Sequence, residues 1–223
     1  MYLLAMVERG IGPGGGLPRG RHGLTAEEVA AHQRERIVAA IATTVAGHGF
    51  GGVTVEKIIA DAGVSRSTFY SHFRDKEEAV YIAYELIFER FFAALSDVCD
   101  GSEWPVRVSN GIGSALTFAV GSPAQFQILF PAPMTTDLGA RVSTNNERLA
   151  SLLSGMRSGS PNGSKLPTCT ELFLVVGAAS VVSRWLAEKD SDDRKSLHQQ
   201  LVQLLLIPYY GRSRARRLSR LAG

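Results

Sequence analysis

Side chains that can bond nucleic acid gather in one short stretch, TVEKIIADAGVSRSTFYSHFRDK, which runs from Thr54 to Lys76. Arginine donates two parallel hydrogen bonds to guanine, while hydroxyl groups of serine, threonine and tyrosine bond phosphates or base edges. The stretch contains all of these residue types. Its apolar residues recur at helical spacing on both sides of a glycine. This combination favours contacts between a pair of short helices and nucleic acid.

The spacing predicts where the two helices begin and end. Thr54 can cap the first helix by accepting a backbone N–H bond, and Gly63 supplies the left-handed residue that ends it. Ser65 can cap the second helix, in which Phe69 and Phe73 lie one turn apart for packing. Two helices joined by such a turn form a helix-turn-helix, whose second helix enters the major groove of DNA.

The same stretch resembles the tetracycline-repressor (TetR) family of one-component transcriptional regulators, from about Arg34 to Val80. The resemblance rests on residues in order and at the family's spacing: Gly49-Phe50, Thr54-Val55, Ile59-Ala60, Ala62-Gly63-Val64-Ser65, Thr68, Tyr70, His72-Phe73 and Lys76. It departs from the family at Val45, where a large aromatic residue is common, and at Glu56, where a basic residue would contact DNA more easily.

The resemblance implies an all-α protein with a DNA-binding domain, a long connecting helix and a helical bundle that binds an effector. Arg66 is the first candidate for reading bases, and Tyr70 has packing against the first helix as its alternative. The expected DNA-binding residues are Thr54, Ser65, Arg66, Ser67, Thr68, Tyr70, Ser71, His72 and Lys76.

Composition shifts and helical periodicity divide the chain into four parts. We expect a glycine-rich flexible arm at 1–24, the DNA-binding domain at 25–80, an effector-binding and dimerisation domain at 81–211 and a basic tail at 212–223. Within these parts, capping boxes predict helices from Thr25 to about Gly47 and over 75–98. Further helices are expected at 105–120, 123–131, 135–156, 168–189 and 193–207.

Two of these helices are candidates for a homodimer interface. The helix at 168–189 is apolar on nearly all sides, so we expect it to be buried on more than one face. The helix at 193–207 carries a leucine stripe suited to packing beside it, and Pro208 is expected to stop it. A pair of helices from each subunit would form a four-helix interface. The alternative is that both helices fill a monomer core.

The bundle also contains aromatic side chains of the kind that line apolar pockets. The resemblance implies a cavity for a small apolar or amphipathic effector, and Phe118, Phe126 and Phe173 are the candidate lining residues. Most aromatic residues in such a bundle simply fill the core. The identity of the effector does not follow from these residues.

Charge and cysteine content narrow the classes of protein further. The net charge is +3, but without the five arginines after Gly211 nineteen basic residues face 21 acidic ones, a net charge of −2. DNA affinity must therefore come from local placement of charge.

Cys99 and Cys169 are far apart and form no metal-ligand cluster, so no metal site is predicted. The longest apolar run, Leu172–Val182, is too short to span a bilayer. We expect a cytoplasmic protein without a membrane partner.

Catalytic motifs are the remaining alternative. The sequence contains no G-x-S-x-G, no H-E-x-x-H and no P-loop, and Gly111-Ile-Gly113 fails the dinucleotide fingerprint. No catalytic residue and no cofactor are predicted. The sequence leaves open a small-molecule-binding protein or enzyme on a TetR-like scaffold, and a regulator without a small-molecule effector.

Overall fold

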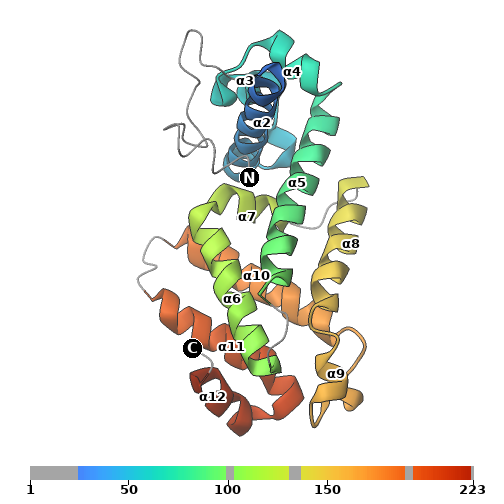
Figure 1. Cartoon of the computed structure of the whole chain (residues 1–223), viewed down its shortest axis with the longest axis vertical. Coiled ribbons are helices and arrows are strands. Elements are labelled where there is room, and N and C mark those ends of the chain that lie inside the picture. The colour runs from blue at the N-terminus through green and yellow to red at the C-terminus, as the bar shows by residue number, and fades with distance from the viewer. Residues whose placement is uncertain (1–24, 99–102, 131–136, 189–192, 222–223) are drawn as a thin grey trace. The chain divides into compact units, whose positions relative to one another are not determined.

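The chain folds into helices joined by short connections (Figure 1). This computed structural model describes residues 25–98, 103–130, 137–188 and 193–221, and every regular element in these ranges is a helix. The predicted all-α fold is confirmed. Two compact units divide the chain, Met1–Glu85 and Leu86–Gly223. The arm predicted at 1–24 lies outside the described residues.

The first unit is built from α2 (Ala26–His48), the short helix η1 (Phe50–Gly52), α3 (Val55–Ala62), α4 (Arg66–His72) and the start of α5 (Lys76–Ser96). The predicted caps are present. Thr25 and Glu28 form a capping box with N···O distances of 2.7 and 3.1 Å. Gly63 ends α3 at φ 59°, and its carbonyl accepts a bond from Arg36 at 3.1 Å. Three fully buried side chains, Ile41, Ile58 and Phe69, connect α2, α3 and α4 in one core.

The second unit is a bundle that begins with the last turns of α5. It contains α6 (Trp104–Gly121), α7 (Pro123–Leu129), α8 (Asp137–Ser151), α9 (Met156–Gly159), η2 (Gly163–Lys165), α10 (Thr170–Ala187), α11 (Arg194–Tyr210) and α12 (Arg212–Leu221). In this bundle α6 packs against α11, and α10 packs against α8 (Figure 1). Ser114 of α6 donates to the carbonyl of Ala94 in α5 at 2.9 Å, which ties these two helices together.

Burial of α10 and α11 differs from the prediction. Within one chain α10 is buried mainly along one face, and Phe173 on the opposite face is 76% exposed. Helix α11 as a whole packs chiefly against α6 and α12 and less against α10. Sequence periodicity identified both apolar helices but not their neighbours, because it does not record which helices meet.

Pro208 does not stop α11, contrary to the prediction. The helix continues to Tyr210, and Gly211 follows it at φ 73°. Proline removes one backbone N–H, but its own φ is compatible with a helix. So close to the end of α11, the loss concerns a single hydrogen bond within the last turn. The glycine is therefore the actual end of the helix.

The segment predicted as a basic tail forms a helix, α12, which packs on the bundle. Ala215 and Ser219, one turn apart, are buried at 0% and 2% exposure, while the arginines point outward. The helix packs against α11 and α6, and Arg214 lies 5.3 Å from the ring centroid of Tyr210. Like charges alone would keep this segment unfolded. The small buried side chains of Ala215 and Ser219 let α12 pack against the bundle. The arginine-rich composition of the segment did not reveal this buried face.

Removing residues 212–223 should therefore lower the stability of the protein as well as its positive charge. Truncation exposes the faces of α11 and α6 that α12 covers, and we expect a loss of about 1–3 kcal/mol in unfolding free energy. Urea unfolding of the truncated and full chains measures it. The matched control replaces Arg216 and Arg217, both exposed, with glutamine, which removes charge but keeps the helix. Equal stability of the truncated and full chains would contradict the packing role.

Candidate DNA interface and apolar cavity

Helix α4 divides its side chains between the core and the solvent. Phe69 is fully buried, and the T-shaped contact between the rings of Phe69 and Tyr70 has a centroid distance of 5.3 Å. Tyr70 is nevertheless 48% exposed, so about half of this residue remains open to solvent. Ser65, Arg66, Ser67 and Ser71 are also exposed. The helix thus presents an arginine, hydroxyl groups and a phenol to solvent, which are donors suited to bases and phosphates.

Arg66, the predicted base reader, is held by an ion pair with Glu56 of α3. Its Nη2 atom lies 2.7 Å from Glu56 Oε1, and the two side chains are 60% and 65% exposed. The backbone N–H of Glu56 and the Arg66 guanidinium hold the pKa of this carboxyl below its usual range against the opposing effect of desolvation. The sequence marked Glu56 as unusual but did not reveal this pairing, because the two residues belong to different helices.

The hydroxyl groups at the start of α4 form a local cluster. Ser65 Oγ accepts from the Thr68 backbone N–H at 3.0 Å and lies 2.8 Å from the hydroxyl oxygens of Ser67 and Thr68. Ser71 donates to the carbonyl of Thr68 at 2.7 Å. These bonds fix the first turn of the helix and orient its hydroxyls. Ser65 therefore has a structural role in addition to any contact with DNA.

His72, another predicted phosphate contact, is half-buried at the end of α4. Its Nε2 atom is shielded from solvent and bonds no other described group. Burial, followed by the nearby charge of Arg34, lowers the pKa of His72 and favours the neutral ring. A contact between His72 and a phosphate stays a prediction.

Thr54 and Lys76 lie at helix starts, as predicted. Thr54 Oγ1 accepts from the backbone N–H of Lys57 at 3.3 Å and caps α3. Lys76 opens α5, where its Nζ atom lies 3.3 Å from a carboxylate oxygen of Glu77 and its side chain is 35% exposed. Such a surface ion pair contributes at most about 1 kcal/mol, so it can be exchanged for a phosphate contact.

Replacing Arg66 with alanine should relax sequence preference and cost about 1–3 kcal/mol in specific binding, because a bidentate base contact is lost. Lys76→Ala is the matched control for a phosphate contact. It should weaken specific and random DNA alike and lower the salt slope by about one per subunit. Fluorescence anisotropy with specific and with random DNA, at several salt concentrations, distinguishes the effects of the two substitutions. Equal losses on the two DNAs for Arg66→Ala would reject a reading role.

Glu56→Gln should strengthen binding to DNA. The substitution removes a negative charge that faces the phosphates and competes for Arg66, while its amide keeps the size of the side chain. We expect a gain of about 1 kcal/mol per subunit, larger at low salt because the pair is exposed. Anisotropy titrations with the wild type and the variant measure it. A weaker complex would show instead that Glu56 positions Arg66 for contact.

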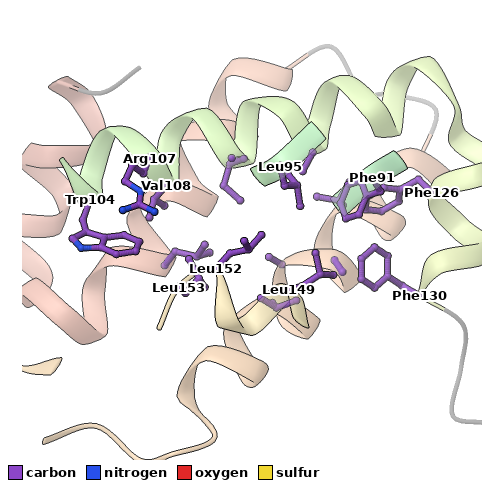
Figure 2. Close-up of a pocket in the computed structure, with 18 residues that line it drawn as sticks. Phe91, Leu95, Trp104, Arg107, Val108, Phe126, Phe130, Leu149, Leu152 and Leu153 are labelled. Atoms are coloured by element: carbon purple, nitrogen blue, oxygen red, sulfur yellow. The ribbon is translucent and has the colours of Figure 1, made fainter. Parts of the chain in front are cut away.

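The second unit encloses an apolar cavity of about 100 Å³ (Figure 2). Side chains from six helices line it: Phe91 and Leu95 from α5, Trp104, Arg107, Val108, Gly111, Ile112 and Ala115 from α6, Phe126 from α7, Leu149 from α8, Val175, Ala178, Ala179 and Val182 from α10, and Leu205 from α11, with Phe130, Leu152 and Leu153 at the ends of α7 and α8. A site with this lining suits an apolar ligand.

The three predicted ligand-binding residues lie in different places. Phe126 lines the cavity and is 2% exposed. Phe118 lies outside it, but its ring contacts Phe91 at a centroid distance of 5.1 Å, and it lines a neighbouring groove of mixed polarity with His198. Phe173 is exposed on α10, so the prediction for this residue is corrected.

The sequence alone did not assign Trp104 or Phe130 to the pocket that both residues line. It did not identify the wall formed by α5 and α8. Single-sequence patterns cannot show which faces of six helices converge. The apolar spacing of Phe91 and Leu95, one turn apart, was the available signal.

The two ends of the cavity differ in chemistry (Figure 2). At one end Phe91, Phe126 and Phe130 form an aromatic cluster with centroid distances of 5.2 to 6.0 Å. At the other end the guanidinium carbon of Arg107 lies 4.0 Å from the ring centroid of Trp104. Arg107 is the one charged residue among the described residues that line the cavity.

Potential metal ligands do not cluster in the described ranges. No group of three or more His, Cys, Asp or Glu side chains that could hold a metal ion occurs there. Helix α10 is long and apolar enough to cross a membrane by length and composition, a property that packing helices of soluble proteins share. One such helix is weak evidence for a membrane span.

The first unit and its exposed α4 define a helix-turn-helix DNA-binding protein. Residues 37–80 match the family model of bacterial regulatory proteins of the tetR family. Among curated proteins, none matches the chain. The domain match identifies residues 37–80 as a DNA-binding domain of the tetR kind, and the helical fold of the described residues agrees with it.

Solved structures agree with this fold over most of the chain. A TetR-like regulator from Rhodococcus sp. RHA1 has 20% identity and a TM-score of 0.68, over 86% of this chain and 97% of that one. The fatty acid degradation regulator FadR from Bacillus halodurans has 21% identity and a TM-score of 0.65. The match covers 77% of this chain and 97% of that one. FadR from Bacillus subtilis, in complex with stearoyl-CoA, has 18% identity and a TM-score of 0.62. The match covers 78% of this chain and 97% of that one.

Proposed function

We propose that the protein is a ligand-responsive homodimeric regulator that acts in the cytoplasm and is released from a pseudo-palindromic operator by a small apolar or amphipathic effector. The observation that carries the proposal is the continuity of α5. Lys76 begins this helix, and Phe91 and Leu95 near its other end line the cavity. A shift of the cavity wall is thereby transmitted to a predicted phosphate contact.

Dimerisation through α10 and α11 is the second part of the proposal. Phe173, Val176, Gly177 and Val181 form an open apolar face on α10, and Leu204 on α11 is 53% exposed. An added Cβ at Gly177 would meet no other atom within 4 Å, so a partner helix can approach closely. Burying these side chains against a second copy is favourable at about 25 cal/mol per Å². The dimer would place two α4 helices in successive major grooves, about 34 Å apart.

The size of the cavity supports a response to ligand. At about 100 Å³ it is smaller than the roughly 150 Å³ apolar cavity that accommodates benzene. We expect a longer ligand to move the walls apart as it enters. It therefore binds the expanded state more tightly, which is the condition for shifting the equilibrium between two states.

An ion pair between α5 and α8 opposes this expansion. Arg148 Nη1 and Nη2 lie 2.6 and 3.2 Å from the two carboxylate oxygens of Glu89, and the same guanidinium lies over the rings of Phe88 and Phe92. Arg148 precedes Leu149, which lines the cavity. Separation of α8 from α5 by a ligand would strain or break this bidentate contact, and α5 would then move.

Related structures support the class of effector. One solved relative is a FadR bound to stearoyl-CoA, and another is a gamma-butyrolactone receptor. Both ligand names describe molecules with an apolar part and a polar part. The cavity here combines the same two features, an aromatic end and an arginine end.

A thermal-shift screen of apolar and amphipathic metabolites, followed by anisotropy on the bound DNA, tests the proposal. We expect compounds that raise the melting temperature to weaken DNA binding at least tenfold. Leu149→Trp, which fills the cavity, should abolish the shift, whereas the exposed Val120→Trp should not. Strong stabilisation with unchanged DNA affinity would refute the ligand response and favour a regulator controlled by its abundance.

A further inference from the structure

The polarity of the cavity restricts its ligand more narrowly than size does. Trp104, Val108, Ile112 and Ala115 lie at helical spacing on the cavity face of α6, and Arg107 lies at the edge of the same face. The Nε atom of Arg107 is shielded from solvent, so the head of the side chain is partly desolvated. This position is consistent with a charged group that serves a ligand.

We propose that the effector is an amphipathic acid whose carboxylate binds Arg107 and whose hydrocarbon chain extends toward Phe91, Phe126 and Phe130. This inference rests on the proposed function, because it names the ligand class for the same cavity. Stacking on Trp104 fixes the plane of the guanidinium, and the N–H donors of arginine lie in that plane as a fork that matches a carboxylate. The Arg107 and aromatic ends lie at opposite ends of the cavity (Figure 2).

The path between these ends suits an unbranched chain. From Arg107 to Ala115 the cavity follows α6 for about 12 Å at 1.5 Å per residue. Leu95, Leu149 and Leu152 line its middle, so no polar group of a ligand is satisfied there (Figure 2). A second charge along the chain would be buried without a partner, which is costly. The ligand should therefore have one polar end only.

Three probes of equal chain length separate the charge of the head from the apolar part: octanoate, 1-octanol and octylamine. Isothermal titration with the full-length wild type should show octanoate binding at least tenfold more tightly than 1-octanol, and octylamine binding most weakly. In Arg107→Met, the affinity for octanoate should fall to that for 1-octanol, while the affinity for 1-octanol stays within about twofold. Retained binding of 1-octanol shows that the cavity of the variant is intact.

Two control variants make the result specific. Arg217→Met removes an exposed arginine that does not line the cavity, and it should leave all three affinities unchanged. Arg107→Lys keeps the charge without the planar fork and should restore part of the preference for octanoate. Equal binding of octanoate and 1-octanol by the wild type, or failure of all three probes to bind, would overturn the assignment of an acid.

DNA release distinguishes this inference from the proposed function. If 1-octanol and octanoate bind equally and both release DNA, the ligand response stands and the role of Arg107 fails. If octanoate binds through Arg107 but leaves DNA affinity unchanged, the contact between the ligand carboxylate and Arg107 stands. The proposal that a ligand releases the protein from DNA then fails. We expect octanoate to bind through Arg107 and to weaken the DNA complex.

Discussion

Val176→Glu should convert the protein from a dimer to a monomer and weaken operator binding by at least about a hundredfold. Val176 is 43% exposed within one chain, so the substitution should not disturb the fold of the subunit. In the proposed dimer it would bury a carboxylate in an apolar helix interface, where an unpaired charge is strongly unfavourable. Loss of the second subunit removes the gain from two linked binding events, which reaches 10² to 10⁴.

Val120→Glu is the matched control, because Val120 on α6 is 47% exposed and lies outside the proposed interface. Light scattering reports the mass of both variants, and anisotropy reports binding to a full operator and to a half-site. Half-site affinity should stay nearly constant for both. A dimeric Val176→Glu protein with normal affinity would reject this interface, and a monomeric one with normal affinity would reject the need for a dimer.

Arg157→Ala should reduce the free energy of unfolding by about 3 kcal/mol, because it leaves the buried Glu171 carboxylate without its cation. Glu171 is 6% exposed, and one of its oxygens accepts from Arg157 Nη2 at 2.6 Å. The other accepts from the hydroxyl of the buried Tyr209 at 2.6 Å. Arg157 also donates to the carbonyls of Leu166 and Pro167, so it holds the segment before α10.

The pH dependence of this effect has a definite sign. Burial raises the pKa of Glu171, but the bonds from Arg157 and Tyr209 outweigh it and hold the pKa below its usual 4.5. The pair therefore stabilises the wild type fully above the unfolded pKa and loses its contribution as pH falls through the folded pKa. In Arg157→Ala the carboxyl should protonate more readily, so the difference in stability should shrink from pH 7 to pH 4.

Urea unfolding at several pH values measures both effects. Arg194→Ala is the control, because this exposed arginine donates to Thr117 at 2.6 Å and should contribute less than about 0.5 kcal/mol. If Arg157→Ala lowers the free energy of unfolding only slightly, or by the same amount at every pH, the buried Glu171 carboxylate does not need the Arg157 cation for stability.

The sequence predicted helices well where a capping residue and the helical spacing of apolar residues indicated the same segment. Thr25, Thr54 and Ser65 cap α2, α3 and α4 as expected. Errors arose where tertiary contacts decide. The arginine-rich composition concealed the buried face of α12, and the register of α4 could not show that packing shields His72 Nε2 from solvent. These features depend on neighbours distant in sequence.

The candidate sites show the same limit. The exposed face of α4 followed from one helix and its caps, so Arg66 and Tyr70 could be identified from the sequence. Glu56 pairs with Arg66 across two helices, and Arg107 joins a cavity whose walls come from α5 to α11. Such sites require the three-dimensional arrangement, because no spacing within one segment encodes them.

Selection of duplex DNA from a random library by the purified chain, in parallel with Arg66→Ala, tests directly whether the protein is a dimeric sequence-specific regulator. The wild type should enrich an inverted repeat whose half-sites are centred about 34 Å apart, one turn of the double helix. Arg66→Ala should lose information at the bases that this arginine reads. Enrichment of no sequence by the wild type, or of the same sequence by both proteins with equal information, would contradict reading of DNA by α4.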